Sequence, residues 1–202
     1  MVYDILKDIR CAKYRRLLDF LNERCDTFTF MFPKYHCLAV TEDNYEIMSD
    51  ESHKIGDKFY IEESDALREE KMFSEYIENN RQLLQRLSSS YIRTFETTCY
   101  GGQITGYVCL ANVYMLNSDS LEVLKSQKSL FSWQRVYASK CSLPCDLCFY
   151  EKGVPVLETV SHESEGWLYI NDDELRKLNN IRIKVERSIN QYVPKADPQL
   201  ML

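Results

Sequence analysis

Residues 91–115, YIRTFETTCY-GG-QITGYVCLANVYM, decide the fold. Both runs are rich in β-branched and aromatic residues, which favour strands. The pair Gly101-Gly102 lies between them, and a two-residue turn joining antiparallel strands needs positive φ angles that glycine adopts without steric cost. The stretch therefore predicts a β-hairpin with strands over 91–100 and 103–115.

Other segments have the same strand character. Glu151-Lys152-Gly153 lies between β-rich runs at 147–150 and 154–160, which predicts a second hairpin. Phe28, Phe30 and Phe32 lie two residues apart, the period of side chains on one face of a strand, and Pro33 ends the run. Further strands are expected at 36–40, 132–138 and 167–170, with short ones at 45–48 and 59–61.

Apolar residues at spacings of three and four predict helices. The first covers 2–25, with a bend where the stripe slips between Ile9 and Tyr14. The others run from Ser64 to about Leu87, from 118 to about 130, and from the cap Asn171 to Tyr192. Hairpins and helical blocks without βαβ alternation predict an α+β fold, an antiparallel sheet built from hairpins with helices packed mainly on one face.

Length and composition bound the organisation. A chain of 202 residues with 45% hydrophobic residues fits a single domain, 1–202, with a sizeable core. A candidate subdomain boundary lies near 88–90, at three consecutive serines, between an acidic helical and strand half (1–87) and a sheet-rich half (91–193). Residues 194–202 begin with Pro194, which stops the expected helix, and they are expected to form a flexible tail.

Localisation follows from what the sequence lacks. It contains no run of 18 apolar residues and no signal-peptide pattern at its start, so we expect a cytoplasmic protein without a transmembrane helix. The 8 cysteines are then expected to be mostly reduced.

Charge is distributed unevenly along the chain. Residues 42–80 hold thirteen acidic and four basic side chains, a net charge of −9, whereas the whole chain is −6 and the rest is therefore +3. Such a segment favours a basic protein partner and disfavours nucleic acid or an anionic membrane. The simpler alternative is a solvated acidic surface without a partner.

Carboxylates on a folded surface can imitate phosphates, occupy a basic cleft and accelerate encounter with it. We therefore expect a non-enzymatic interaction protein of the inhibitor or immunity type, with no cofactor. Tyr45, Phe59 and Tyr60 are the expected aromatic anchors, since aromatic residues often dominate binding energy. The expected partner-binding carboxylates are Glu42, Asp43, Glu46, Asp50, Glu51, Glu62, Glu63, Glu69 and Glu70. Neither the partner's identity nor the oligomeric state follows from the sequence.

Cys141-x3-Cys145-x2-Cys148 supports an alternative. This spacing resembles the cluster loop of radical-SAM enzymes, but that family places the loop ahead of most of a large barrel, and only 54 residues follow Cys148. A zinc site with His162, Cys99 or Cys109 as fourth ligand fits the spacing better, although a second Cys-x2-Cys pair is missing. The expectation is therefore no bound metal, with a small metal-binding regulatory module as the alternative.

A small cysteine-dependent enzyme is the third hypothesis. Cys99, His162 and Asn171 follow the chain order of a papain-like site, but Cys99 lies in an expected strand, whereas a nucleophilic cysteine usually needs a nearby base and a helix N-terminus. Walker, GxSxG and EF-hand patterns are absent from the sequence. No catalytic residue is assigned.

Overall fold

The computed structural model describes residues 1–33, 63–100, 103–134 and 142–202, and within these ranges the side chains of 63–69, 98–100 and 103–107 are not described. The described strands form one antiparallel sheet of eight, ordered β3-β4-β2-β5-β6-β7-β1-β8. They are β1 (Val2–Asp4), β2 (Thr27–Pro33), β3 (Tyr91–Tyr100), β4 (Gln103–Met115), β5 (Cys145–Glu151), β6 (Val154–Val160), β7 (Glu165–Tyr169) and β8 (Glu186–Arg187).

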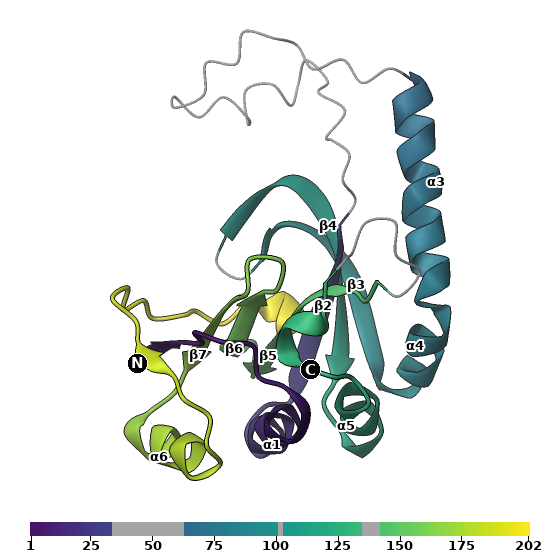
Figure 1. The fold of residues 1–202 in the computed structure, drawn as a ribbon. Coiled ribbons are helices and arrows are strands. Elements are labelled where there is room, and N and C mark those ends of the chain that lie inside the picture. The colour runs from purple at the N-terminus through teal and green to yellow at the C-terminus, as the bar shows by residue number, and fades with distance from the viewer. Residues whose placement is uncertain (34–62, 101–102, 135–141) are drawn as a thin grey trace, which may run out of the picture.

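Helices cover one face of this sheet. They are α1 (Cys11–Asn22), α3 (Glu63–Asn79), α4 (Arg81–Arg86), α5 (Ser118–Lys125) and α6 (Asp172–Asn180), with 3-10 turns η2 (Ser88–Ser90) and η3 (Leu130–Ser132). A third 3-10 turn, η4 (Pro198–Leu200), packs on the opposite face. Figure 1 shows α1, α5 and α6 side by side beneath the strands, and α3 standing at the end of the sheet formed by β3 and β4. The predicted α+β fold with an antiparallel sheet is confirmed.

The main core lies between the sheet and these helices, and aromatic side chains dominate it. Phe28, Phe30 and Phe32 of the central strand β2 all point into it, as their spacing predicts. Phe30 stacks on Trp133 with ring centroids 5.7 Å apart. The indole N–H of Trp133 donates to the hydroxyl of Tyr14 on α1 at 2.9 Å, so the largest buried side chain keeps its polar group satisfied.

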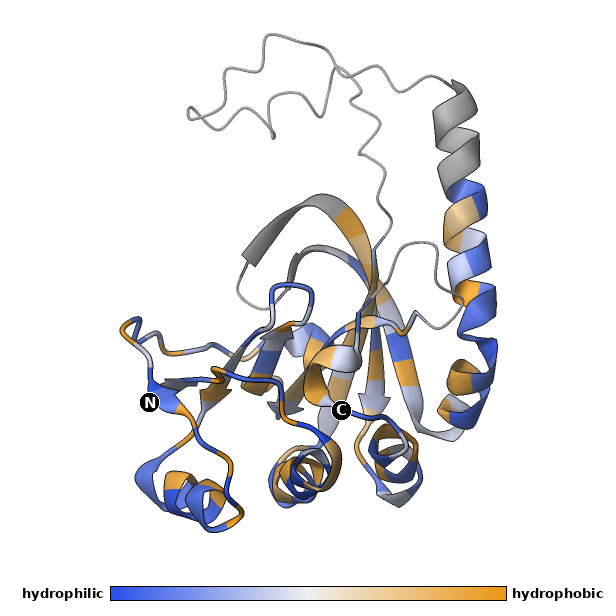
Figure 2. Cartoon of the chain, viewed as in Figure 1, coloured by the Kyte–Doolittle hydropathy of each residue, from blue (hydrophilic) through white to orange (hydrophobic). Residues whose placement is uncertain are grey.

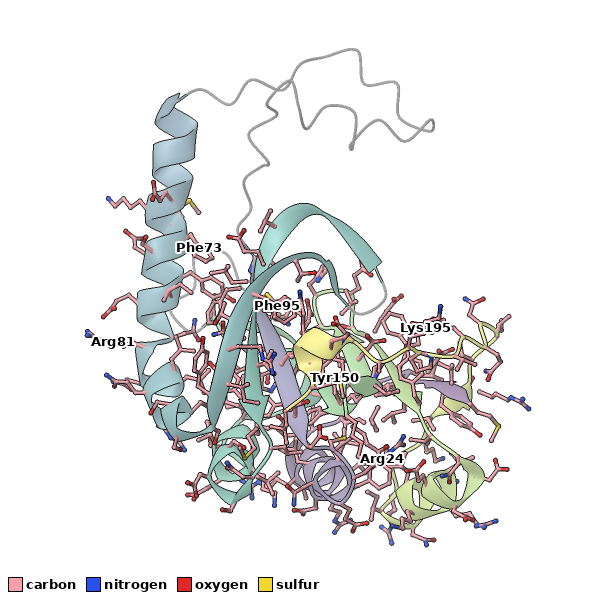
Figure 3. All side chains as sticks on the ribbon, turned by 180° about the vertical axis from the view of Figure 1, so that it is seen from behind. Arg24, Phe73, Arg81, Phe95, Tyr150 and Lys195 are labelled. Carbon is pink, nitrogen blue, oxygen red and sulfur yellow. The ribbon has the colours of Figure 1, made fainter. Side chains whose placement is uncertain are left out.

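The opposite face of the sheet carries a smaller apolar cluster. Val113, Cys148 and Tyr150 pack there against Leu200 of η4, and Figure 3 shows Tyr150 beside this turn. The backbone carbonyl of Leu200 accepts a hydrogen bond from the Thr27 hydroxyl at 2.9 Å. Residues 194–202, expected as a flexible tail, thus include a side chain that is only 7% exposed.

The expected first helix, 2–25, is wrong in its first half. Residues 2–4 form β1, which pairs with β7, and α1 begins only at Cys11. Between them the Ile5 amide donates to the Gly166 carbonyl at 2.8 Å and the Ile9 carbonyl accepts from the Leu130 amide at 3.0 Å. Partners distant in sequence therefore satisfy this backbone, and the slip in the apolar stripe marks the break.

The expected last helix is also too long. It starts as predicted, with Asn171 and Glu174 forming a reciprocal capping box, but ends at Asn180 rather than Tyr192. Arg182 adopts a left-handed φ of 63°, and the chain then extends into β8, which pairs with β1. Sheet formation by this segment replaces the last three turns of the expected helix.

Two further helices differ from expectation. The helix expected to run to Leu87 is interrupted at Asn80, whose side-chain amide donates to the Tyr76 carbonyl at 3.0 Å and separates α3 from α4. The helix expected over 118–130 is capped by Asn117 and ends at Lys125. The strand expected at 132–138 is wrong in its described part, because Ser132 closes the 3-10 turn η3.

Both predicted hairpins are confirmed. Tyr100 pairs with Gln103 across the two-glycine connection, and Glu151 pairs with Val154. The glycines themselves and the strands expected at 36–40, 45–48 and 59–61 lie outside the described residues. Ser88–Ser90 forms η2, and the subdomain boundary there stays a prediction. Among the described helices, none combines the length and apolar character needed to cross a membrane.

Candidate functional site

The described end of the acidic segment is α3, a helix of 17 residues. Six of its residues are acidic and two are basic, a net charge of −4. Figure 1 shows its N-terminal half extending beyond the sheet, while its C-terminal half lies against the domain. The described contacts of α3 with the core therefore come from its C-terminal half.

One apolar edge of α3 anchors it. Tyr76 is 3% exposed, its ring meets Phe32 edge-to-face at 5.3 Å, and its hydroxyl donates to the Leu143 carbonyl at 2.6 Å. Phe73 and Ile77 pack against the main core, and Figure 3 shows Phe73 directed toward the sheet. These three residues lie along one edge of the helix, and the other described side chains of α3, at 70–72, 74, 75, 78 and 79, are exposed.

Carboxylates occupy that solvent-facing surface. Glu70, Glu75 and Glu78 are exposed. Glu78 pairs with Arg81 at 3.1 Å, across two side chains that are about two-thirds exposed. Glu70 and Glu75 form no ion pair with any residue that the structure describes. The surface thus presents negative charge that the described part of the chain does not neutralise.

The structure brings together part of the predicted set. Glu63, Glu69 and Glu70 all lie on α3, and only the side chain of Glu70 is described. Glu75 and Glu78 lie on the same helix, and the continuation of the acidic run along the expected helix was the signal that could have added them to the predicted site. Outside the described residues lie Glu42, Asp43, Tyr45, Glu46, Asp50, Glu51, Phe59, Tyr60 and Glu62.

Two of the three clustered cysteines, Cys145 and Cys148, lie on β5. A backbone irregularity around Asp146, whose φ is 58°, puts Cys145 and Cys148 on the same face of the strand in two separate apolar clusters. Cys109, one candidate fourth ligand, packs beside Cys145. His162 is instead exposed, with its imidazole 3.7 Å from Glu163.

No three metal-ligating side chains come together in the described ranges. Cys141 lies outside those ranges, so the metal-binding alternative stays a prediction.

Burial also determines the chemistry of the described thiols. The pKa of the Cys148 thiol is raised well above its ordinary value, chiefly because the group is buried away from water. Burial raises the pKa of Cys25 in the same way. A thiol that stays protonated is a poor nucleophile and packs as a small apolar side chain.

The third hypothesis gains no support from the geometry of Asn171. Its side chain accepts a hydrogen bond from the Glu174 amide at 3.0 Å and so caps α6. Cys99 lies on β3, and its side chain is not described.

A cleft of about 510 Å³ opens between α1 and α6. Its charged side chains are balanced, two basic and two acidic, and Lys177 pairs with Glu23 at 2.9 Å. The lining residues are Arg16, Asp19, Phe20, Glu23, Lys177, Asn180 and Ile181. This balance selects neither an anionic nor a cationic ligand.

Comparison with known proteins adds no relative. No protein-family model, curated protein or solved structure matches the chain. The functional argument therefore rests on the chain's own charges and geometry.

Proposed function

We propose that this protein is a non-enzymatic interaction protein whose acidic segment, residues 42–80, binds a basic protein partner. The observation that carries the proposal is the exposed carboxylate surface of α3, with Glu70 and Glu75 unpaired among the described residues. The inhibitor or immunity type is its most specific form, in which the segment occupies a basic, phosphate-binding cleft of the partner.

The anchoring of α3 supports this proposal. Tyr76 and Phe73 fix the helix on the sheet, so the carboxylates are held on a rigid element rather than on a free chain. Ordering them beforehand reduces the conformational entropy lost on binding. The folded domain gains little stability from them, because exposed charges contribute about 1 kcal/mol or less each.

Long-range attraction between an acidic surface and a basic partner mainly accelerates association. The association rate should then fall as salt rises, since the screening length is about 8 Å at physiological ionic strength and shorter above it. The dissociation rate depends on close contacts and should change less than the association rate as salt rises.

The test begins with co-purification from the native host, comparing wild type with the double variant Glu70→Lys/Glu75→Lys. A matched control, Glu122→Lys/Glu165→Lys, changes the net charge equally at exposed positions on α5 and β7. We expect a basic protein with wild type and the control, and its loss with the α3 variant. Stopped-flow kinetics on the purified pair should show a lower association rate for the α3 variant, and likewise when Glu62, Glu63, Glu69 and Glu70 are all changed to lysine.

Two results contradict the proposal. One is a native partner that is acidic. The other is an association rate that the α3 variant leaves unchanged or that the control lowers as much.

A further inference from the structure

The segment that follows α6 carries a net positive charge, opposite in sign to that of α3. Residues 184–195 contain Lys184, Arg187 and Lys195 and a single acidic residue, Glu186, a net charge of +2. All three cationic side chains are exposed, and none forms an ion pair with a described residue. Figure 1 shows this segment looping out beside the N-terminus, at the end of the sheet away from α3, and Figure 3 marks Lys195 on it.

Large apolar side chains project from the same loop. Ile189 is 97% exposed, Val193 82% and Tyr192 54%. A single exposed aliphatic residue is common, but two almost fully exposed within five residues are not explained by packing against the residues that the structure describes. The sequence pattern extended the last helix as far as Tyr192. In the structure Ile189 projects into solvent, and the half-exposed ring of Tyr192 lies edge-to-face on Tyr169 with ring centroids 6.2 Å apart.

The loop is fixed rather than loosely attached. The Gln191 side chain accepts from the Val2 amide at 3.2 Å and donates to the Val2 carbonyl at 3.1 Å and the Ser188 carbonyl at 2.7 Å. These bonds tie the middle of the loop to β1. Ile189 and Val193, two residues on either side of Gln191, are both exposed on this anchored loop.

The loop is suited to an anionic lipid surface. It combines two exposed aliphatic side chains, an aromatic ring with a polar end, and flanking cations. Lipid tails take up isolated apolar side chains without a shaped cavity, tyrosine favours the headgroup level, and cations are drawn to acidic lipids. A protein partner would instead need a pocket for each tip. Charge complementarity and the protruding shape therefore both favour lipid.

We propose that the 184–195 loop docks this protein onto anionic membrane surfaces, with Ile189 and Val193 entering the acyl boundary and Lys184, Arg187 and Lys195 meeting acidic headgroups. The acidic segment led us to expect no membrane contact. That expectation rested on the charge of residues 42–80 alone, whereas screening lets a distant basic segment act by its own local charge.

Flotation with phosphatidylcholine vesicles containing about one-third phosphatidylserine tests this on the full chain. We expect wild type to bind and pure phosphatidylcholine to bind much less. Ile189→Ser/Val193→Ser should lower the partition coefficient by about tenfold or more. Lys184→Gln/Arg187→Gln should lower it by about fivefold for each lost cation. Met72→Ser and Lys128→Gln remove an exposed apolar and an exposed basic side chain elsewhere and should change nothing.

Tyr192→Trp provides an independent measurement. Vesicles with brominated acyl chains should quench its added fluorescence, read as a difference from wild type because Trp133 and Trp167 also emit. If a water-soluble quencher quenches the added fluorescence but the brominated acyl chains do not, the side chain stays in water and the proposed insertion is wrong.

The other outcomes are equally decisive. If wild type does not float with acidic vesicles, the proposal is wrong. If the charge variant loses binding while Ile189→Ser/Val193→Ser keeps it, and poly-L-glutamate competes, the loop binds acidic polymers such as acidic proteins and not lipid.

Discussion

Glu158 of β6 is a buried carboxylic acid, 7% exposed. It accepts a hydrogen bond from the Tyr169 hydroxyl at 2.6 Å. Burial raises the pKa values of the neighbouring Cys148 thiol and Tyr150 phenol, and the charge of Glu158 raises them further. Burial in turn raises the pKa of Glu158 above its ordinary value of 4.5, more than the Tyr169 hydrogen bond lowers it.

This pKa predicts a pH dependence of stability. A raised carboxyl pKa means that the folded state holds the proton more tightly, so the contribution to stability is complete below the unfolded-state pKa and is lost as pH rises through the folded-state pKa. We expect Glu158→Gln to raise the free energy of unfolding at about pH 8 by on the order of 1 kcal/mol and to change it little at about pH 4. Urea unfolding at both pH values measures this. Glu163→Gln, at an exposed site, should reproduce the wild-type profile.

The Tyr14–Trp133 hydrogen bond is the second residue-scale determinant, because both side chains are 0% exposed. Tyr14→Phe removes the acceptor and leaves the indole N–H buried without a described partner. We expect this to lower the free energy of unfolding by about 1–3 kcal/mol, the usual penalty for a buried unsatisfied donor. Tyr91→Phe removes a hydroxyl from a ring that is 48% exposed and should change it by less than about 0.5 kcal/mol. Equal losses in the two variants would show that the buried bond contributes nothing specific.

At the scale of elements, η4 acts as a cover for the open side of the sheet. Leu200 packs on Cys148, Tyr150 and Val113, and the Asp197 amide donates to the Gly153 carbonyl at 3.0 Å. Leu200→Ala should lower the free energy of unfolding by about 2 kcal/mol, the low end for a buried leucine because a segment near the chain end can relax. Thiol-labelling kinetics should also show faster reaction of Cys148.

Leu202→Ala is the matched control, because Leu202 is 63% exposed. It should leave both measurements unchanged. If Leu200→Ala behaves like this control, residues 194–202 form the flexible tail that the sequence predicts.

The elements that the sequence predicts correctly are those whose determinants are local. A two-glycine connection defines the β3–β4 hairpin, and Asn171 with Glu174 defines the start of α6. Residues 2–4 were assigned to a helix because their periodicity fits one, yet they pair with residues 167–169, which local periodicity does not reveal. The predicted end of the last helix was wrong for the same reason, because β8 forms by pairing with β1, which is distant in sequence.

In the candidate site, too, the features set by local sequence were predicted and those set by distant contacts were not. Charge and helical spacing in the sequence placed Glu69 and Glu70 on the outer side of a helix, and α3 carries both. The contact that fixes this helix, from Tyr76 to the Leu143 carbonyl, joins residues 67 positions apart. The sequence pattern extended the last helix too far, as far as Tyr192, so the exposure of Ile189 emerged only from the folded arrangement of β8 and the loop.

At the scale of the whole molecule, the sheet separates two surfaces of opposite charge. Figure 2 shows apolar residues on the sides of α1 and α5 that face the strands, so the described core lies between these helices and the sheet. In Figures 1 and 3, α3 and the 184–195 loop lie at opposite ends of the sheet. Seven strand spacings of about 4.8 Å put these ends roughly 34 Å apart, well beyond the screening length of about 8 Å at physiological ionic strength.

Separation on this scale predicts that the two surfaces act independently. Glu70→Lys/Glu75→Lys should lower the association rate with the basic partner and leave flotation with acidic vesicles unchanged. Lys184→Gln/Arg187→Gln should do the reverse, and the combined variant should show the sum of both free-energy changes, since sites this far apart without shared partners are additive within about 0.5 kcal/mol. Measuring both activities for all three variants at physiological salt tests this. Coupling well above that limit would mean that the two surfaces contact a common partner or that one change disturbs the fold, and far-ultraviolet circular dichroism of the variants separates these causes.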